Sequence, residues 1–402
     1  MTTLVRRTRT SRPPDADYFP DSGIPTSEHE ERKEAYFFMK RLYNFSAGPS
    51  QLPLSVLEKA QADLVSYQDC GSSVMEMSHR SAYFEPIIQD AEATLRRIMN
   101  IPDNYAVLFL QGGASLQFSM IPMNLAKQGD TMAYIVTGQF AKKAFQEGKR
   151  WGNAVCVASG EDTNFQTIPE VTPDMIPADA KFVHFTGNNT IFGTTFNTLP
   201  DVGDKTMVCD LSSVILGKEF DVSKFGLIYA GAQKNMGIGG LTVVIVRKDL
   251  ISSDLDPVVP SMLRYDLMEK NNSMYNTPPC WAIYMAGLVF HWVEDMGGIK
   301  AMEKINKEKS DLLYDYLDQS KLFHPVANKK DRSYMNVTFT LPTEEQTKAF
   351  LALCKERDMI NIKGHRSVGG CRASIYNAMP IEGVKLLVET MKEFEAKETG
   401  NV

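Results

Sequence analysis

Paired cysteines and long apolar runs are both missing from this 402-residue sequence. The six cysteines form neither a C-x-x-C pair nor a cluster with histidine, which argues against a disulfide framework and a zinc site. We expect no metal, and we expect Cys156 and Cys209, which lie in strand-like runs, to be small buried side chains. No run reaches the roughly 18 apolar residues of a membrane span. The longest candidate, residues 281–293, includes His291 and predicts a buried helix.

An excess of positive charge is also lacking. The net charge is -6 and the pI is about 5.7, so there is no basic field to attract nucleic acid, and anionic substrates would need local arginines. We expect a cytoplasmic protein that binds neither nucleic acid nor membrane. Nucleotide motifs are incomplete, since Gly237-Ile-Gly-Gly240 lacks the third glycine of a dinucleotide fingerprint and no P-loop occurs.

Residues 1–38 do not share the pattern of the rest. They are rich in polar and charged residues and sustain no helical or strand period, which predicts a disordered leader or extension. The acidic residues that follow the arginine-rich start argue against an organelle transit peptide.

From Leu52 the sequence alternates between apolar runs and helix-like segments. Strands are predicted at residues 106–110, 132–136, 182–185, 207–211, 227–230 and 241–246, and helices at 54–65 and 87–99. This alternation predicts an α/β fold whose large, mostly parallel mixed sheet is covered by helices on both faces. Ligands of such sheets bind at the carboxyl ends of the strands.

The second half of the chain predicts a smaller C-terminal α/β domain. After an irregular, proline-containing stretch at 251–280, we expect helices at 281–296 and 299–317, a strand at 335–341, a helix after Thr343, a strand at 373–376 and a closing helix. We expect residues 54–296 to form the large domain, and residues 39–53 and 297–402 to form the small one.

Three features could carry chemistry. The run Gln111–Ser115 joins a strand to a helix through two glycines, which suits a phosphate at a helix N-terminus. Asp210 ends a strand, and Lys234 lies between two strands among glycine and apolar residues. Desolvation would lower the pKa of Lys234 and favour a neutral amine able to form a Schiff base, and a carboxylate can keep a pyridine nitrogen protonated. Taken singly, the run 111–115 also fits an ordinary strand-to-helix turn, Asp210 a helix cap and Lys234 a solvated loop charge.

Six strings, occurring in order between Tyr43 and about Glu395, resemble motifs of one family. They are YNFSAGPS (43–50), MEMSHRS (75–81), NNTIFG (188–193), KFGLIYAGAQKN (224–235), SMYNTPP (273–279) and GHRSVGGCRASIYNA (364–378). The chain thereby resembles the phosphoserine aminotransferase family, within class V of the fold type I aminotransferases that depend on pyridoxal 5′-phosphate. The resemblance implies that cofactor and a homodimer with shared active sites.

The resemblance also implies roles for individual residues. Lys234 would join the cofactor covalently, Asp210 would contact the pyridine nitrogen, and Thr190 would bond the phenolic oxygen. Around the cofactor phosphate the family pattern implies Ala114, Ser115 and Gln233, together with Asn276 and Thr277 from the other subunit.

The substrates that the resemblance implies carry carboxylate and phosphate groups. Arginines suit them, because a guanidinium pairs bidentately with either group. The resemblance implies that Arg372 holds the α-carboxylate. It implies that His79 with Arg80, and His365 with Arg366, hold the substrate phosphate or the side-chain carboxylate of glutamate.

Two positions depart from the family pattern. Phe140 stands where the family usually has the tryptophan that stacks on the cofactor ring, so we expect retained activity with altered cofactor affinity or colour. Ser115 stands where some members carry arginine, which leaves more of the phosphate recognition to Arg80 and Arg366.

The implied reaction transfers an amino group from L-glutamate to 3-phosphohydroxypyruvate, giving 2-oxoglutarate and O-phospho-L-serine for serine biosynthesis. A related substrate, 4-phosphohydroxythreonine of vitamin B6 synthesis, stays open. Two alternatives also remain: another class V activity, such as alanine–glyoxylate or serine–pyruvate transfer, and a catalytically inactive anion-binding protein.

Overall fold

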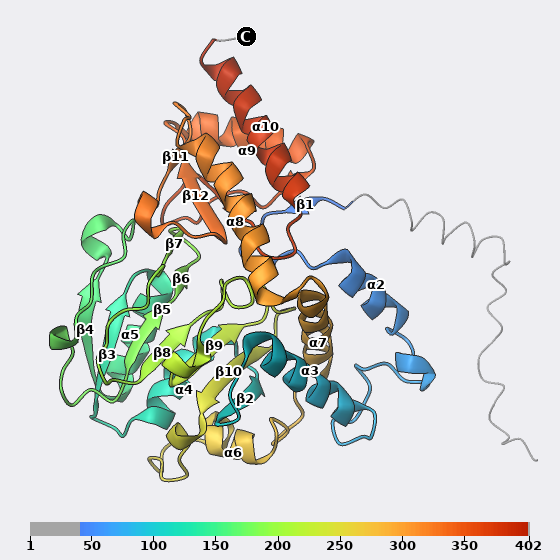
Figure 1. The fold of residues 1–402 in the computed structure, drawn as a ribbon, viewed down its shortest axis with the longest axis vertical. Coiled ribbons are helices and arrows are strands. Elements are labelled where there is room, and N and C mark those ends of the chain that lie inside the picture. Colours follow the sequence, from blue (N-terminus) through green and yellow to red (C-terminus); the bar gives the residue numbers. More distant parts are fainter. Residues whose placement is uncertain (1–40, 401–402) are drawn as a thin grey trace, which may run out of the picture. The chain divides into compact units, whose positions relative to one another are not determined.

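The structure, a computed structural model that describes residues 41–400, contains a seven-stranded sheet (Figure 1). The strand order is β2-β10-β9-β8-β5-β3-β4, and only β10 runs antiparallel to its neighbours. The expected mostly parallel mixed sheet is therefore confirmed, whereas the expected leader, residues 1–38, lies outside the described residues. The strands are β2 (Tyr105–Leu110), β3 (Thr131–Val136), β4 (Asn153–Ser159), β5 (Val183–Thr186), β8 (Met207–Asp210), β9 (Leu227–Gly231) and β10 (Thr242–Arg247).

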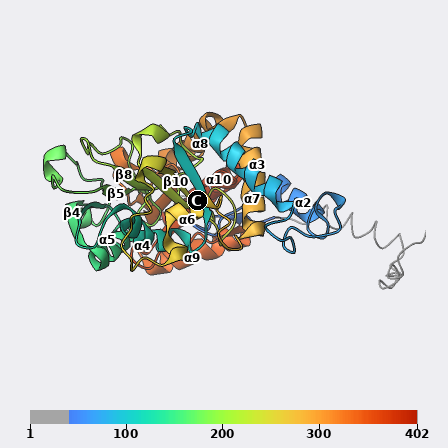
Figure 2. The same ribbon diagram turned by 90° about the horizontal axis from the view of Figure 1, so that it is seen from below.

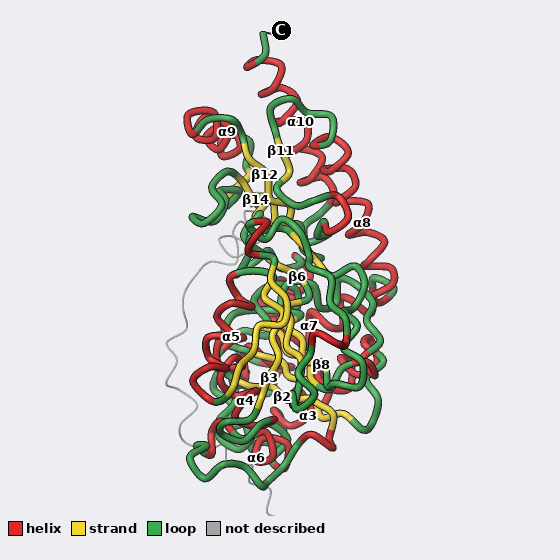
Figure 3. Tube along the Cα trace, turned by 90° about the vertical axis from the view of Figure 1, so that its left-hand side faces the viewer, coloured by secondary structure: helices red, strands yellow, loops and turns green. Residues whose placement is uncertain are grey.

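Helices cover both faces of this sheet, as Figures 2 and 3 show. Residues Val107 and Phe109 of β2 face one hydrophobic cluster, and their neighbours Ala106, Leu108 and Leu110 face the other, because side chains alternate along a strand. Burial on both faces explains why the strands are continuously apolar in sequence. The first face is covered by α2 (Leu54–Ala62), α3 (Phe84–Met99) and α7 (Cys280–Asp295), the second by α4 (Gly113–Leu125), α5 (Gln139–Trp151) and α6 (Tyr265–Lys270).

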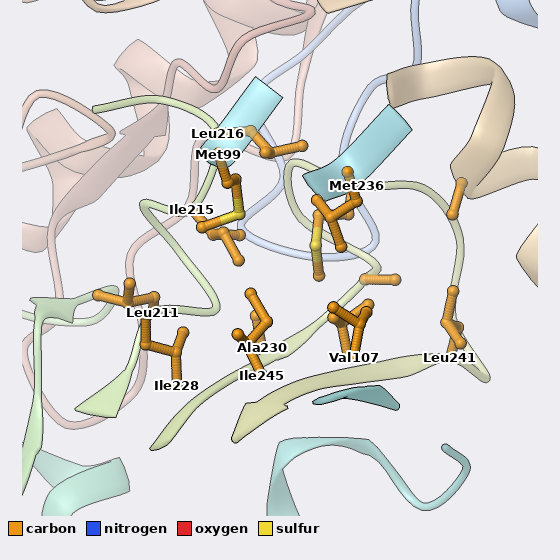
Figure 4. Close-up of a cluster of buried hydrophobic side chains, with 14 of the residues drawn as sticks. Met99, Val107, Leu211, Ile215, Leu216, Ile228, Ala230, Met236, Leu241 and Ile245 are labelled. Atoms are coloured by element: carbon orange, nitrogen blue, oxygen red, sulfur yellow. The ribbon is translucent and has the colours of Figure 1, made fainter. Parts of the chain in front are cut away.

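The core of the first face supports the loops that follow β8 and β9. Figure 4 shows Ile228, Ala230 and Ile245 of the sheet below Ile215 and Met236, two fully buried side chains from those loops. Burying an aliphatic side chain of this size stabilises the folded state by roughly 1.5–3 kcal/mol. The loops at the carboxyl ends of these strands are thus anchored from below.

A second group of elements has its own sheet and its own core. Its hydrophobic cluster joins Phe45 to residues between 313 and 394. The division into a large and a small domain stays a prediction. The short strand β1 adds to β13 in parallel, so residues before α2 pair with this group. Its elements are β1 (Tyr43–Asn44), α8 (Gly298–Leu317), β11 (His324–Pro325), β12 (Asn336–Thr340), α9 (Glu344–Glu356), β13 (Met359–Ile360), β14 (Cys371–Ser374) and α10 (Ile381–Glu398).

Three expectations about these elements were wrong, and two are confirmed. Cys156 is exposed, because β4 is the edge strand of the sheet and none of its residues is buried, whereas Cys209 is buried as expected. The stretch 251–280 contains the short helix α6. The strand expected at 373–376 is β14 at Cys371–Ser374. The buried helix expected at 281–296 is α7, and no helix within residues 41–400 is long and apolar enough to cross a membrane.

Candidate active site

The candidate residues of the large sheet meet at the carboxyl ends of its parallel strands. Asp210 is the last residue of β8, and Lys234 follows β9 by three residues. Thr190 follows β5 at the hairpin of β6 (Asn188–Asn189) and β7 (Thr194–Thr195). This edge is where ligands of parallel sheets bind.

The amine of Lys234 is held between a hydroxyl and an aromatic ring. Its Nζ donates a hydrogen bond of 2.8 Å to Oγ1 of Thr190 and lies 5.3 Å from the ring centroid of Phe140. Burial lowers the pKa of Lys234 to about 8, the charge of Asp210 acts in the opposite direction, and the charge of Arg372 lowers it further. A much larger fraction of this amine is therefore neutral near pH 7 than for an exposed lysine, as a nucleophilic amine requires.

Asp210 is a buried carboxylate with unused acceptor capacity. Its side chain accepts a hydrogen bond of 2.9 Å from the backbone N–H of Ser212, and the residue is only 5% exposed. Burial raises its pKa, while the charge of Lys234 and the bond from Ser212 lower it. No cationic side chain within residues 41–400 forms an ion pair with it, so a protonated pyridine nitrogen fits this site.

The N-terminus of α4 presents free backbone N–H groups at the same edge. The helix starts at Gly113 after Gly112, whose φ of +89° suits glycine, and a Cβ on Gly112 would lie 2.4 Å from Leu116. No side chain caps this N-terminus, so the N–H groups of the first turn, which includes Ala114 and Ser115, can bind the phosphate of a cofactor.

A cluster of cations faces the site from the small domain and α5. Arg372 on β14 lies close enough to the carbonyl of Thr190 for a weak hydrogen bond, 3.4 Å, and its buried Nε has no partner among the described residues. Burial lowers the pKa of His365, and the positive charges of Arg372, Arg366 and Lys143 lower it further. An anion bound among these groups would relieve their mutual repulsion.

The remaining predicted residues are not joined to this cluster within one chain. Between residues 41 and 400, no hydrogen bond or ion pair links His79, Arg80, Asn276 or Thr277 to Lys234, Asp210 or Arg372. The side chains of Arg80, Asn276 and Thr277 are exposed, and buried Nε2 of His79 has no partner among the described residues. The carbonyl of Thr277 accepts a 3.2 Å bond from Gln111, beside the glycine turn of α4.

Several supporting residues were missed by the sequence-based predictions. Ser50 donates to the backbone carbonyl of Lys234, and its own N–H bonds the carbonyl of Gln233 at 2.9 Å, which fixes the lysine loop. Ser212 accepts from the N–H of Gly231 at 3.0 Å and so ties β8 to β9. The position of Ser50 in the YNFSAGPS motif was a usable signal, whereas Ser212 gave none.

Comparison with known proteins identifies the class of this site. The family described as Aminotransferase class-V matches residues 42–387, and the chain belongs to that family. A phosphoserine aminotransferase of Bacillus cereus is 55% identical over 359 residues, which span 89% of this chain and 99% of the relative.

Solved structures agree with this assignment. The phosphoserine aminotransferase of Bacillus circulans subsp. alkalophilus has a TM-score of 0.86 at 46% identity, covering 89% of this chain and 99% of that one. A phosphoserine aminotransferase of Trichomonas vaginalis with bound pyridoxal phosphate has a TM-score of 0.83 at 38% identity, covering 88% and 100%. Within class V, the chain therefore belongs to the phosphoserine aminotransferase family, and its cofactor is pyridoxal 5′-phosphate.

Proposed function

We propose that Lys234, Asp210 and Arg372 carry amino transfer between L-glutamate and 3-phosphohydroxypyruvate, giving O-phospho-L-serine and 2-oxoglutarate in serine biosynthesis. The observation that carries this proposal is a partly desolvated amine between Thr190 and Phe140, with a buried carboxylate and a half-buried guanidinium as electrostatic neighbours. Bound pyridoxal phosphate supplies an electrophilic carbon and an electron sink.

The protein residues then do the acid–base work. Nζ of Lys234, oriented by Thr190, can take the Cα proton of a bound amino acid and later return it, because its lowered pKa lies near the working pH. The carboxylate of Asp210 would stabilise the positive charge of the protonated pyridine nitrogen of the cofactor. The free N–H groups at the start of α4, together with Gln233, would hold and orient the cofactor phosphate.

Substrate recognition is assigned to the cations. Arg372 would hold the α-carboxylate through its unpaired Nε and an adjacent N–H. His365 and Arg366 would hold the distal phosphate or carboxylate, together with His79 and Arg80. We assign His79, Arg80, Asn276 and Thr277 to the site of the partner subunit in a homodimer. Within residues 41–400, none of them is hydrogen-bonded to Lys234, Asp210 or Arg372, and three of the four are exposed.

The cytoplasm is the proposed compartment. All six cysteines lie within residues 41–400 and are unpaired there, which suits a reducing environment. In addition to serine synthesis, the same anion clamps suit 4-phosphohydroxythreonine.

A comparison of amino donors tests the proposed substrate class. We expect kcat/KM for phosphoserine to exceed that for alanine by on the order of 100-fold or more, because alanine offers nothing to His365 and Arg366 and leaves their charges unpaired. The assay follows 2-oxoglutarate consumption with each donor at equal concentration. Equal turnover of the two donors would favour an alanine–glyoxylate or serine–pyruvate activity, and a colourless protein that turns over neither would favour an inactive anion-binding protein.

Replacing Arg372 by lysine is expected to raise the KM for phosphoserine by about 10- to 100-fold, because one ammonium cannot reproduce the two parallel bonds of a guanidinium. Steady-state kinetics at fixed 2-oxoglutarate measure the change. Arg332→Lys is the matched control, since the fork of Arg332 pairs with Asp318 at 3.0 Å. An unchanged KM in Arg372→Lys would contradict the assigned role.

A further inference from the structure

A chain of buried amides connects the lysine loop to the segment that follows Arg372. Oδ1 of Asn235, the residue next to Lys234, accepts a 3.0 Å hydrogen bond from the backbone N–H of Asn377. The side chain of Asn235 also donates to the carbonyl of Ile215 at 3.1 Å. Asn235 and Asn377 are 5% and 6% exposed, so these bonds form away from water.

The same chain of bonds reaches the loop that follows Asp210. Nδ2 of Asn377 donates to the carbonyl of Leu216 at 2.9 Å. Ile215 and Leu216, whose carbonyls are used in this way, are themselves anchored on the sheet by their buried side chains (Figure 4). The two asparagines thus bind three segments to one another, and each segment leads directly to a residue of the active site.

Helix α8 closes the network from the other side. Asn306 donates at 2.8 Å to Oδ1 of Asn377 and at 3.1 Å to the carbonyl of Gly217. One turn further along, Nζ of Lys309 donates to the carbonyls of Ile375, Tyr376 and Met379 at 3.1, 2.7 and 3.0 Å. Asn306 and Lys309 are fully buried. Every bond from these two side chains goes to the segment after Arg372 or to the loop after Asp210.

We propose that Asn377, with Asn235 and Asn306, is a positioning residue that fixes the amine of Lys234 relative to the guanidinium of Arg372. The inference rests on the proposed roles of those two groups. Lys234 belongs to a loop of the large sheet and Arg372 to a strand of the small one, so their separation depends on contacts between the two cores. Asn377 serves this purpose because its side chain both donates and accepts.

The size of the effect follows from the precision that catalysis needs. A displacement of about 1 Å between reacting groups can cost on the order of 100-fold in rate. Leaving a buried carbonyl or amide unpaired costs about 1–3 kcal/mol, so loss of one amide shifts or hydrates its neighbours. A loosened loop would let water reach Lys234, whose pKa would rise towards that of an ordinary lysine.

The test compares three asparagine-to-leucine variants of the full-length protein. Asn377→Leu and Asn306→Leu remove amides of the network and keep the number and branching of the side-chain heavy atoms. Asn124→Leu is the matched control, because Asn124 is also buried and makes three bonds, to Met120, Leu263 and Tyr265, on the opposite face of the sheet. For each variant we measure thermal unfolding, and kcat and KM of the holoenzyme. In cofactor-free protein we also measure how the labelling of Lys234 by an amine-reactive reagent depends on pH, quantified by mass spectrometry.

All three variants are expected to unfold at lower temperature. Only Asn377→Leu and Asn306→Leu should also label Lys234 about tenfold more slowly at pH 7 and lose on the order of 100-fold in kcat/KM, mostly in kcat. If Asn377→Leu does not fold, Asn306→Leu carries the same test. Labelling and kinetics that match those of Asn124→Leu would overturn the proposal. Because labelling requires no turnover, an enzyme without phosphoserine activity would refute the proposed function but leave this result readable.

Discussion

Replacing Lys234 by alanine is expected to lower kcat/KM for phosphoserine by on the order of 10⁴-fold or more, because one change removes both a nucleophile and a general base. The remaining site can still bind the cofactor through Asp210 and the N-terminus of α4. The purified variant should therefore retain cofactor that borohydride cannot fix to the protein. Steady-state kinetics and mass spectrometry after reduction measure the two effects.

Two further variants separate chemistry from charge. Lys234→Arg keeps a cation near Asp210 but cannot supply a neutral amine, so it should be as inactive as the alanine variant. Lys218→Ala is the matched control, because burial also lowers the pKa of Lys218, outside the cluster around Lys234. The role assigned to Lys234 would be lost if its alanine variant still formed a reducible covalent adduct with the cofactor at that site.

Replacing Asp210 by asparagine is expected to make the amine of Lys234 more reactive and at the same time to lower kcat. The charge of Asp210 raises the pKa of Lys234, so removing that charge should bring the pKa below about 8 and make the amine of cofactor-free protein more reactive at pH 7. Catalysis should nevertheless fall by on the order of 10²–10³-fold, because an amide cannot balance a protonated ring nitrogen. Labelling of Lys234 and measurement of kcat test the two directions separately.

The control for this prediction is Asp331→Asn. Asp331 is also buried, and its carboxylate accepts a 3.0 Å bond from the N–H of Ile168 outside the site. We expect this variant to lose stability without any change in the labelling of Lys234. An Asp210→Asn enzyme with unchanged kcat, or one in which Lys234 became less reactive, would contradict the account of Asp210.

The sequence predicted the inner strands of the sheet well because burial on both faces makes them continuously apolar. The runs predicted at 132–136 and 227–230 agree with β3 and β9 to within one residue at each end. The strand-like run around Cys156 agrees with β4, but its burial was predicted wrongly, because β4 lies at the edge and none of its residues is buried. Strand β14 ends earlier than predicted, and the carbonyls of Ile375 and Tyr376, just beyond it, bond Lys309 instead of a neighbouring strand.

Some residues of the site could be predicted from the sequence, and others could not. Lys234 and Thr190 could be identified because each lies in a family motif, and Asp210 because it ends a predicted strand. The structure brings the three residues together. The network of Asn306 and Asn377 could not, because its bonds join residues 71 positions apart and depend on how α8 packs. Buried asparagine has no periodic signature. The residues assigned to the partner subunit remain predictions.

The attachment site of the cofactor tests the central claim most directly. The native holoenzyme is reduced with borohydride and digested, and the modified lysine is located by mass spectrometry, with and without prior addition of phosphoserine. We predict that the label lies on Lys234 alone and that phosphoserine prevents it by releasing the amine. A label on another lysine, such as Lys143 or Lys309, would contradict the account, as would a label on Lys234 that phosphoserine leaves unchanged.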